Sequence, residues 1–105
     1  MNVFPGSVRG RAVEGLGASW PVASPVAVRE GQAVQYGIRP TDLRLADAGI
    51  PAQVVVVEPT GAETELLLQV ADQQLVVVIH GRTNAGPGDT VHLSLDAAKA
   101  HVFDA

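Results

Sequence analysis

The chain of 105 residues lacks cysteine entirely and contains a single lysine, Lys99. Without cysteine it cannot form disulfides, thiolate metal sites or a cysteine nucleophile. Basic residues are scarce, because 7 Lys+Arg stand against 11 Asp+Glu and give a formal net charge of −4. A domain that binds nucleic acid normally carries a basic face, so this composition predicts no nucleic-acid partner.

Long apolar runs are also missing, and aromatic side chains are few. No segment reaches the ~18 apolar residues that span a bilayer, and the N-terminus lacks the basic and apolar segments of a signal peptide. Only Phe4, Trp20, Tyr36 and Phe103 are aromatic. The hydrophobic fraction is nevertheless 47 %, which is enough for a core. We expect residues 1–105 to form one soluble, acidic domain.

Residues typical of β-strands dominate the chain. Valine occurs in short runs separated by glycine, proline and aspartate, which favour turns. Strands are predicted near 7–13, 19–23, 32–39, 51–58, 63–71, 74–81 and 89–95. The turn signals between them are Pro5-Gly6, Glu30-Gly31, Arg39-Pro40, Pro59-Thr60-Gly61, Ala71-Asp72 and Gly86-Pro87-Gly88-Asp89. Single helical turns are expected near 40–43 and 96–100, so the fold class is all-β, as a small barrel or a sandwich.

The chain also contains a candidate internal repeat. Segment 30–40 aligns with segment 87–97 at an offset of 57 residues, the distance from Gly31 to Gly88. The apolar positions then match as Val34 with Val91, Tyr36 with Leu93, Ile38 with Leu95 and Leu45 with Val102. Each copy would consist of a turn, an alternating strand, a helical turn and a short closing strand. Such self-similarity predicts two related structural units.

Three strands are apolar at consecutive positions, over 54–57, 66–68 and 75–79. A sheet with one solvated face should alternate apolar and polar residues. These runs therefore indicate either that both faces pack between two half-barrels or that one face binds a partner. In a domain this small we favour a partner for part of that surface.

Nucleotide-binding loops are not found in the sequence. A P-loop needs glycines followed by Lys and Ser or Thr, whereas Lys99 lies in an Ala-Ala-Lys-Ala segment. The segment Gly15-Leu16-Gly17 begins like a dinucleotide fingerprint but lacks the third glycine and a following helix, so we interpret it as a hairpin turn. No cofactor is expected in this chain.

The polar residues do not form a convincing catalytic or metal-binding pattern. His92, Ser94 and Asp96 share one face of a strand but lie roughly 6.5–7 Å apart along it, too far for a nucleophile and its base. His80 and His101 are expected, like His92, on the surface, so no metal site is predicted.

Three glutamates, Glu58, Glu63 and Glu65, flank the turn at Gly61. Paired carboxylates can perform acid–base chemistry, but they also keep the end of a strand soluble. No aromatic residue lies near them in the sequence to form a pocket. We therefore predict no catalytic residue and no enzymatic activity for this chain.

Four motifs in order resemble a known family. The segment Tyr36-Gly37-Ile38-Arg39-Pro40 is similar to the Gly-Ile-Arg-Pro-Glu segment of the ATPase subunits of ABC importers of the maltose and glycerol-3-phosphate class, although Thr41-Asp42 replaces the glutamate. The other matching segments are Val55-Val56-Val57-Glu58-Pro59-Thr60-Gly61-Ala62-Glu63-Thr64, Pro87-Gly88-Asp89-Thr90-Val91-His92-Leu93 and His101-Val102-Phe103-Asp104. Met1-Asn2-Val3-Phe4-Pro5-Gly6 resembles the stretch that follows the ATPase domain in that family.

The resemblance implies a C-terminal TOBE (transport-associated OB) domain with an OB-like fold. Such a domain would regulate and dimerise a cytoplasmic ATPase subunit at the inner face of the membrane. Its partners would be its own ATPase domain, a second copy of the subunit and the permease subunits, with ATP and Mg²⁺ bound by the parent subunit only. Met1 would then mark an excised fragment or an internal methionine of a longer chain.

The resemblance also suggests interface residues. Glu58, Gly61 and Glu63 are expected at or near a contact surface, while Arg39 and Pro40 would shape a junction between barrels. The alternative is a small-ligand module, since related β domains bind oxyanions such as molybdate or sulfate. Anion capture needs clustered hydroxyl, lysine or free amide groups, and this chain has few. A third alternative, an oligonucleotide-binding OB fold, needs a basic aromatic face that the composition does not provide.

Overall fold

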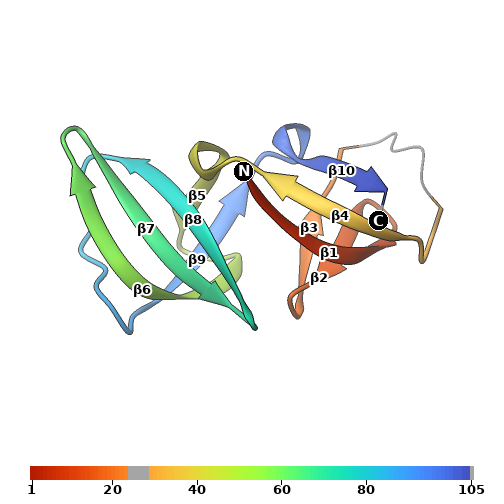
Figure 1. Ribbon diagram of the computed structural model, residues 1–105, viewed down its shortest axis with the longest axis horizontal. Helices are drawn as coiled ribbons and strands as arrows, with labels where there is room; N and C mark the ends of the chain where they lie inside the picture. The colour runs from red at the N-terminus through yellow and green to blue at the C-terminus, as the bar shows by residue number, and fades with distance from the viewer. Residues whose placement is uncertain (24–28, 105) are drawn as a thin grey trace.

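The computed structural model describes residues 1–23 and 29–104, which form two antiparallel five-stranded sheets (Figure 1). The strands are β1 (Asn2–Arg9), β2 (Ala12–Gly15), β3 (Ala18–Pro21), β4 (Ala33–Ile38), β5 (Leu43–Ala46), β6 (Ile50–Thr60), β7 (Glu63–Val70), β8 (Gln73–His80), β9 (Thr90–Leu95) and β10 (His101–Asp104). Two short 3-10 helices, η1 (Pro40–Asp42) and η2 (Ala97–Lys99), are the only helical segments described. None of the described helices has the length or apolar character needed to cross a membrane.

The two sheets lie end to end along the long axis of the molecule (Figure 1). Sheet A has the strand order β10-β4-β1-β2-β3, and sheet B has the order β5-β9-β6-β7-β8. The described residues extend over 41 Å along this axis and 23 Å along each of the other two. The all-β fold class predicted from the sequence is confirmed.

The internal repeat is confirmed in the strand pairing. The two sheets have equivalent strand orders. When the orders are aligned position by position, β10 corresponds to β5, β4 to β9, β1 to β6, β2 to β7 and β3 to β8. The register follows the 57-residue offset, because Leu45 lies opposite Leu93 in sheet B, and Val102 lies opposite Tyr36 in sheet A. The two halves of the chain therefore build equivalent sheets.

Each half gives its last strand to the sheet of the other half. After β4 in sheet A, the chain turns through η1 and enters sheet B as β5, which pairs with β9. After β9, the chain turns through η2 and enters sheet A as β10, which pairs with β4. Both η segments coincide with the helical turns expected near 40–43 and 96–100.

One strand prediction was wrong at the N-terminus. The strand expected over 7–13 is interrupted, because β1 ends at Arg9 and Gly10, with φ +61°, turns the chain into β2. Pro5 and Gly6 lie inside β1 instead of forming a turn. Proline is tolerated there because β2 pairs with β1 only from Ser7 to Arg9.

Gly6 is required by close packing. A Cβ atom at Gly6 would meet Val13 Cγ1, and it would lie 2.7 Å from the carbonyl oxygen of Glu14. The sequence signal at Pro5-Gly6 therefore reports the close approach of β1 and β2. The remaining predicted strands are confirmed within a few residues as β3, β4, β6, β7, β8 and β9.

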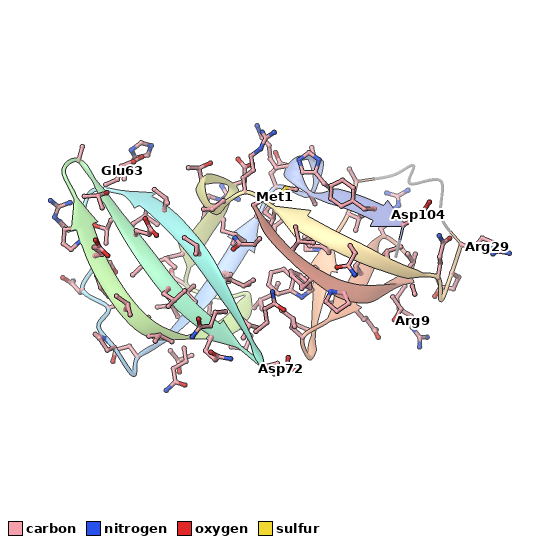
Figure 2. The ribbon with its side chains drawn as sticks, viewed as in Figure 1. Met1, Arg9, Arg29, Glu63, Asp72 and Asp104 are labelled. Atoms are coloured by element: carbon pink, nitrogen blue, oxygen red, sulfur yellow. The ribbon has the colours of Figure 1, made fainter. Side chains whose placement is uncertain are left out.

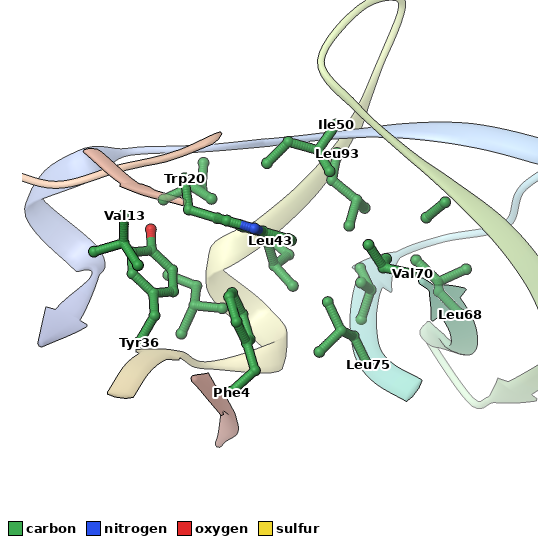
Figure 3. Packing of buried hydrophobic residues seen from close by; sticks show 14 of the residues in the cluster. Phe4, Val13, Trp20, Tyr36, Leu43, Ile50, Leu68, Val70, Leu75 and Leu93 are labelled. Atoms are coloured by element: carbon green, nitrogen blue, oxygen red, sulfur yellow. The ribbon is translucent and has the colours of Figure 1, made fainter. Parts of the chain in front are cut away.

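The core of sheet A is aromatic (Figure 3). The rings of Phe4, Trp20 and Tyr36 are almost fully buried and have centroid separations of 4.7 to 5.8 Å. Trp20 Nε1 donates to the carbonyl oxygen of Gly15 at 2.9 Å, and the Tyr36 hydroxyl donates to that of Pro21 at 2.7 Å. Each buried polar atom thus has a partner, as a stable core requires.

The core of sheet B is aliphatic and continuous with that of sheet A (Figure 3). Its buried side chains include Val54, Leu66, Leu68, Leu75 and Val77. The same strands carry apolar residues on their other face, where Val55 and Val56 are 37 % and 44 % exposed. Consecutive apolar residues on β6 to β8 thus line the core on one side and an open surface on the other.

Candidate interaction surfaces

The residues expected at an interface fall into two separate groups. Glu58, Gly61 and Glu63 lie at the β6–β7 hairpin, at the end of sheet B farthest from sheet A; Figure 2 labels Glu63 there. Arg39 and Pro40 lie where β4 leads into η1, at the junction of the two sheets. These residues therefore belong to two different places on the surface.

The junction is shaped by local backbone geometry. Arg39 is extended, with φ −71° and ψ 146°, as the residue before a proline must be. Pro40 then begins η1, where its fixed φ suits a helical turn. The backbone N–H of Asp42 donates to the carbonyl oxygen of Arg39 at 2.9 Å and closes this turn. Thr41 is exposed, while Asp42 is half-buried.

The tip of the β6–β7 hairpin is held by Arg82, a residue that the sequence did not indicate. Its Nη2 atom donates to the carbonyl oxygen of Gly61 at 2.7 Å, and its Nη1 atom to that of Glu63 at 3.0 Å. Gly61 has φ +70°, as its predicted role in the turn requires. The tip is therefore a fixed element rather than a loose turn.

The three glutamates near this tip are brought onto one face. Glu58 and Glu65 are direct partners across β6 and β7, and Glu63 lies two positions from Glu65 on the same face. His80 Nδ1 lies 3.7 Å from Glu63 Oε2. Within the described part of the chain, neither Glu58 nor Glu65 makes an ion pair. The cluster is an open acidic surface.

The other polar residues singled out in the sequence are dispersed. Asp96 caps η2 by accepting from the backbone N–H of Ala98 at 3.0 Å, which gives this carboxylate a structural role. His80 ends β8, His92 lies on β9, and His101 lies on β10 beside the ring of Phe103. No group of three metal-ligating side chains is found in residues 1–23 and 29–104.

A groove of about 460 Å³ lies between the β2–β3 hairpin of sheet A and strands β6 and β9 of sheet B. Ser19 and Ser94 supply hydroxyl groups to its lining, together with Gly17 and Gly49. Its remaining lining residues are Ala18, Pro21, Ile50, Pro51, Leu93 and Leu95. The described lining contains no lysine or arginine, which weakens it as a site for an oxyanion.

An exposed apolar patch lies on the outer face of sheet A. It is formed by Met1, Val3 and Phe103, which are 57 %, 39 % and 45 % exposed. Gly37 lies between them, and a Cβ atom there would lie 3.1 Å from both Met1 Cε and the ring of Phe103. The ring of His101 stacks on Phe103 with centroids 6.3 Å apart. We call this the sheet A patch.

A family model described as "TOBE domain" matches residues 36–103 of the chain. The chain belongs to the TOBE domain family. The match runs from the centre of β4 to β10 and includes both crossovers between the sheets. The resemblance drawn from the four sequence motifs is thereby confirmed.

The curated relatives are named as ATP-binding proteins, most of them of transport systems. An uncharacterized ABC transporter ATP-binding protein of Sinorhizobium fredii, y4oS, is 41 % identical over 88 residues, which cover 84 % of this chain and 24 % of the relative. The sn-glycerol-3-phosphate import protein UgpC of Chromohalobacter salexigens is 36 % identical over 80 % of this chain and 25 % of its own length. The alpha-glucoside transport protein AglK of Rhizobium meliloti is 30 % identical over 99 % of this chain and 32 % of its own length. The chain thus spans about a quarter to a third of the length of these relatives.

A similar arrangement is found in a solved structure, the cytoplasmic molybdate-binding protein ModG with molybdate bound. The TM-score is 0.78, and the alignment covers 99 % of this chain and 96 % of the ModG chain. Only 14 % of the residues are identical, so the likeness concerns the fold alone.

Proposed function

We propose that this chain is the C-terminal regulatory and dimerisation domain of the ATP-binding subunit of an ABC importer for sugars or glycerol phosphates. The relatives support the solute class, since they include the xylose/arabinose import ATP-binding protein XacK of Haloferax volcanii as well as AglK and UgpC. The ATPase domain of the parent subunit would bind ATP and Mg²⁺ and contact the permease subunits. Residues 1–105 would then work as one domain on the cytoplasmic side of the membrane.

The sheet A patch carries the dimerisation part of this proposal. Its three exposed apolar side chains surround Gly37, and the ionisable side chain at its edge is His101. In a chain with a net charge of −4, a surface of this kind lets two copies approach without placing like charges together. Clusters of exposed apolar side chains are typical of protein contact sites.

Sedimentation velocity over a concentration series tests dimerisation. We expect the unaltered chain to dimerise, and Val3→Ser or Phe103→Ser to shift it toward the monomer. Val55→Ser is the matched control, because Val55 on sheet B is 37 % exposed and Val3 is 39 % exposed. A chain that stays monomeric at high concentration, or an equal effect of the control, would overturn the proposed contact.

The DNA sequence upstream of the Met1 codon tests whether the chain is part of a longer ATP-binding subunit. We expect the reading frame upstream of the Met1 codon to continue into a segment that encodes a P-loop. A stop codon and a ribosome-binding site directly upstream would instead make this a free-standing protein. Calorimetric titration with molybdate, sulfate and glycerol 3-phosphate would then decide whether the alternative, an oxyanion-binding module, is correct; saturable heat would support it.

A further inference from the structure

The outer face of sheet B owes its composition to a β-bulge in β6. Ile50, Ala52 and Val54 alternate toward the core, and continued alternation would turn Glu58 inward. The pairing register shifts between Val54 and Val56, so that Val57 turns toward the core and Glu58 turns outward. Bulges commonly redirect side chains in this way and are typical of functional edges.

The redirected residues form two adjacent zones on this face. The first is an apolar strip in which Val56 lies opposite Leu67 and Leu67 lies opposite Val76, with Val55 and Val78 beside them. The second is the acidic cluster of Glu58, Glu63 and Glu65 near the hairpin tip, where Figure 2 labels Glu63. We call the two zones together the sheet B face.

The acidic cluster lowers the stability of the folded chain. Like charges directly opposite each other on neighbouring strands are destabilising, and Glu58 faces Glu65 in that way. The basic groups at the tip do not pair with these two residues: Arg82 donates to the carbonyl oxygens of Gly61 and Glu63, and His80 Nδ1 lies 3.7 Å from Glu63 Oε2. Among the described residues, Glu58 and Glu65 are thus exposed to solvent and make no ion pair.

We propose that the sheet B face binds a basic amphipathic segment of a second protein, with apolar side chains on the valine–leucine strip and lysine or arginine side chains on Glu58, Glu63 and Glu65. A second copy of this chain that docked through the same face would not fit, because it would place the carboxylates of the two copies against each other. Nucleic acids and anionic lipids are excluded by the same charge argument. This partner chemistry deepens the regulatory part of the proposed function and rests on it.

The experiment uses a fluorescent synthetic peptide of alternating leucine and lysine, titrated with the unaltered chain and followed by fluorescence anisotropy. We expect saturable binding that weakens at high salt, since exposed ion pairs are screened. The double variant Glu58→Gln/Glu65→Gln should weaken binding by about three- to tenfold, because each exposed pair contributes modestly. A peptide of alternating leucine and glutamate should not bind.

Two matched controls test whether binding depends on this face, and not on the net negative charge of the chain or on exposed apolar residues elsewhere. Asp47→Asn/Asp72→Asn changes the net charge equally at exposed positions outside the face and should leave binding unchanged. Val56→Ser should weaken binding, whereas Val3→Ser, on the sheet A patch, should not. An equal loss in the control and test variants, or no binding of the leucine–lysine peptide, would overturn the proposal.

Thermal unfolding and sedimentation keep the outcomes distinct. The double glutamine variant should unfold at a temperature equal to or slightly above that of the unaltered chain, because it removes a repulsive pair, so weakened binding cannot come from misfolding. It should leave self-association unchanged. If it abolished the dimer instead, the sheet B face would be the self-association surface and the inference would be wrong. If no dimer formed but the peptide bound this face, the dimerisation proposal alone would fail.

Discussion

Asn2 joins the two sheets through a single side chain. Its Oδ1 atom accepts from the backbone N–H of Val76, and its Nδ2 atom donates to the backbone carbonyl of Val76, both at 2.8 Å. The amide thereby pairs with the free edge of β8 as a neighbouring strand would. The partners are 74 residues apart in the sequence. No local pattern could therefore predict the contact, although Asn2 lies in one of the family-like segments.

Replacing Asn2 should destabilise the fold markedly. In Asn2→Ala, the N–H and C=O groups of Val76 lose their partners at a part-buried position, and each such loss costs about 1–3 kcal/mol. We expect a decrease of about 2–3 kcal/mol in the free energy of unfolding, measured by urea denaturation. Asn84→Ala, at an exposed loop position, should stay within about 0.5 kcal/mol of the unaltered chain. Equal effects of the two substitutions would contradict the role of Asn2.

Tyr36 should make the fold sensitive to alkaline pH. Burial raises the pKa of the Tyr36 phenol well above its ordinary value of about 10, because the charged form is poorly solvated. The neutral side chain therefore contributes its full stability below about pH 10, and this contribution is lost as the pH rises toward the folded-state pKa.

The single tyrosine makes this measurable by absorbance at 295 nm. We expect tyrosinate to form only together with loss of the far-UV circular dichroism signal. Tyrosinate formation near pH 10 with the strand signal intact would show that the phenol is accessible in the folded protein.

At the scale of single elements, the prediction of strands depended on alternation. Val34 to Ile38 and Val91 to Leu95 alternate cleanly, and β4 and β9 were predicted almost to their bounds. The run Val54 to Val57 contains four identical residues, so the sequence carries no sign of the bulge that turns Glu58 outward. The hairpin tip at Gly61 was predicted from its turn residues, whereas the Arg82 contacts depend on two strands meeting in space.

The close approach of β1 and β2 gives an element-scale prediction. In Gly6→Ala, the new methyl group would collide with Val13 and with the backbone of Glu14. The backbone of Glu14 cannot easily move away, because β2 is paired with β1. Overpacking of this kind typically costs about 1–3 kcal/mol. Urea denaturation should show this loss for Gly6→Ala. Gly86→Ala is the control, because a Cβ atom there has no neighbour within 4 Å; an equal loss in the control would refute the packing argument.

At the scale of the whole molecule, the exchanged strands couple the two sheets. β5 connects directly to β4 of sheet A but pairs in sheet B, and β10 does the converse. The aromatic and aliphatic parts of the core also form one continuous cluster. Each sheet therefore contains one strand that the other half of the chain supplies.

This coupling predicts a single cooperative unfolding transition. Trp20 reports on sheet A through its fluorescence, while far-UV circular dichroism reports on the strands of both sheets. The two signals should give the same urea midpoint and the same slope. An earlier transition of Trp20 would show that sheet A unfolds by itself.

The exchange of terminal strands also bears on how such a chain could have arisen. Residues 2–46 form the first half, and residues 50–104 form the second, yet each half contains only four of the strands in its own sheet. An ancestral protein of one half could have formed a five-stranded sheet only by exchanging its last strand with a second copy. The ancestor implied by this geometry is therefore a strand-exchanged dimer. Gene fusion would then have converted an assembly that depended on concentration into one that forms within a single chain.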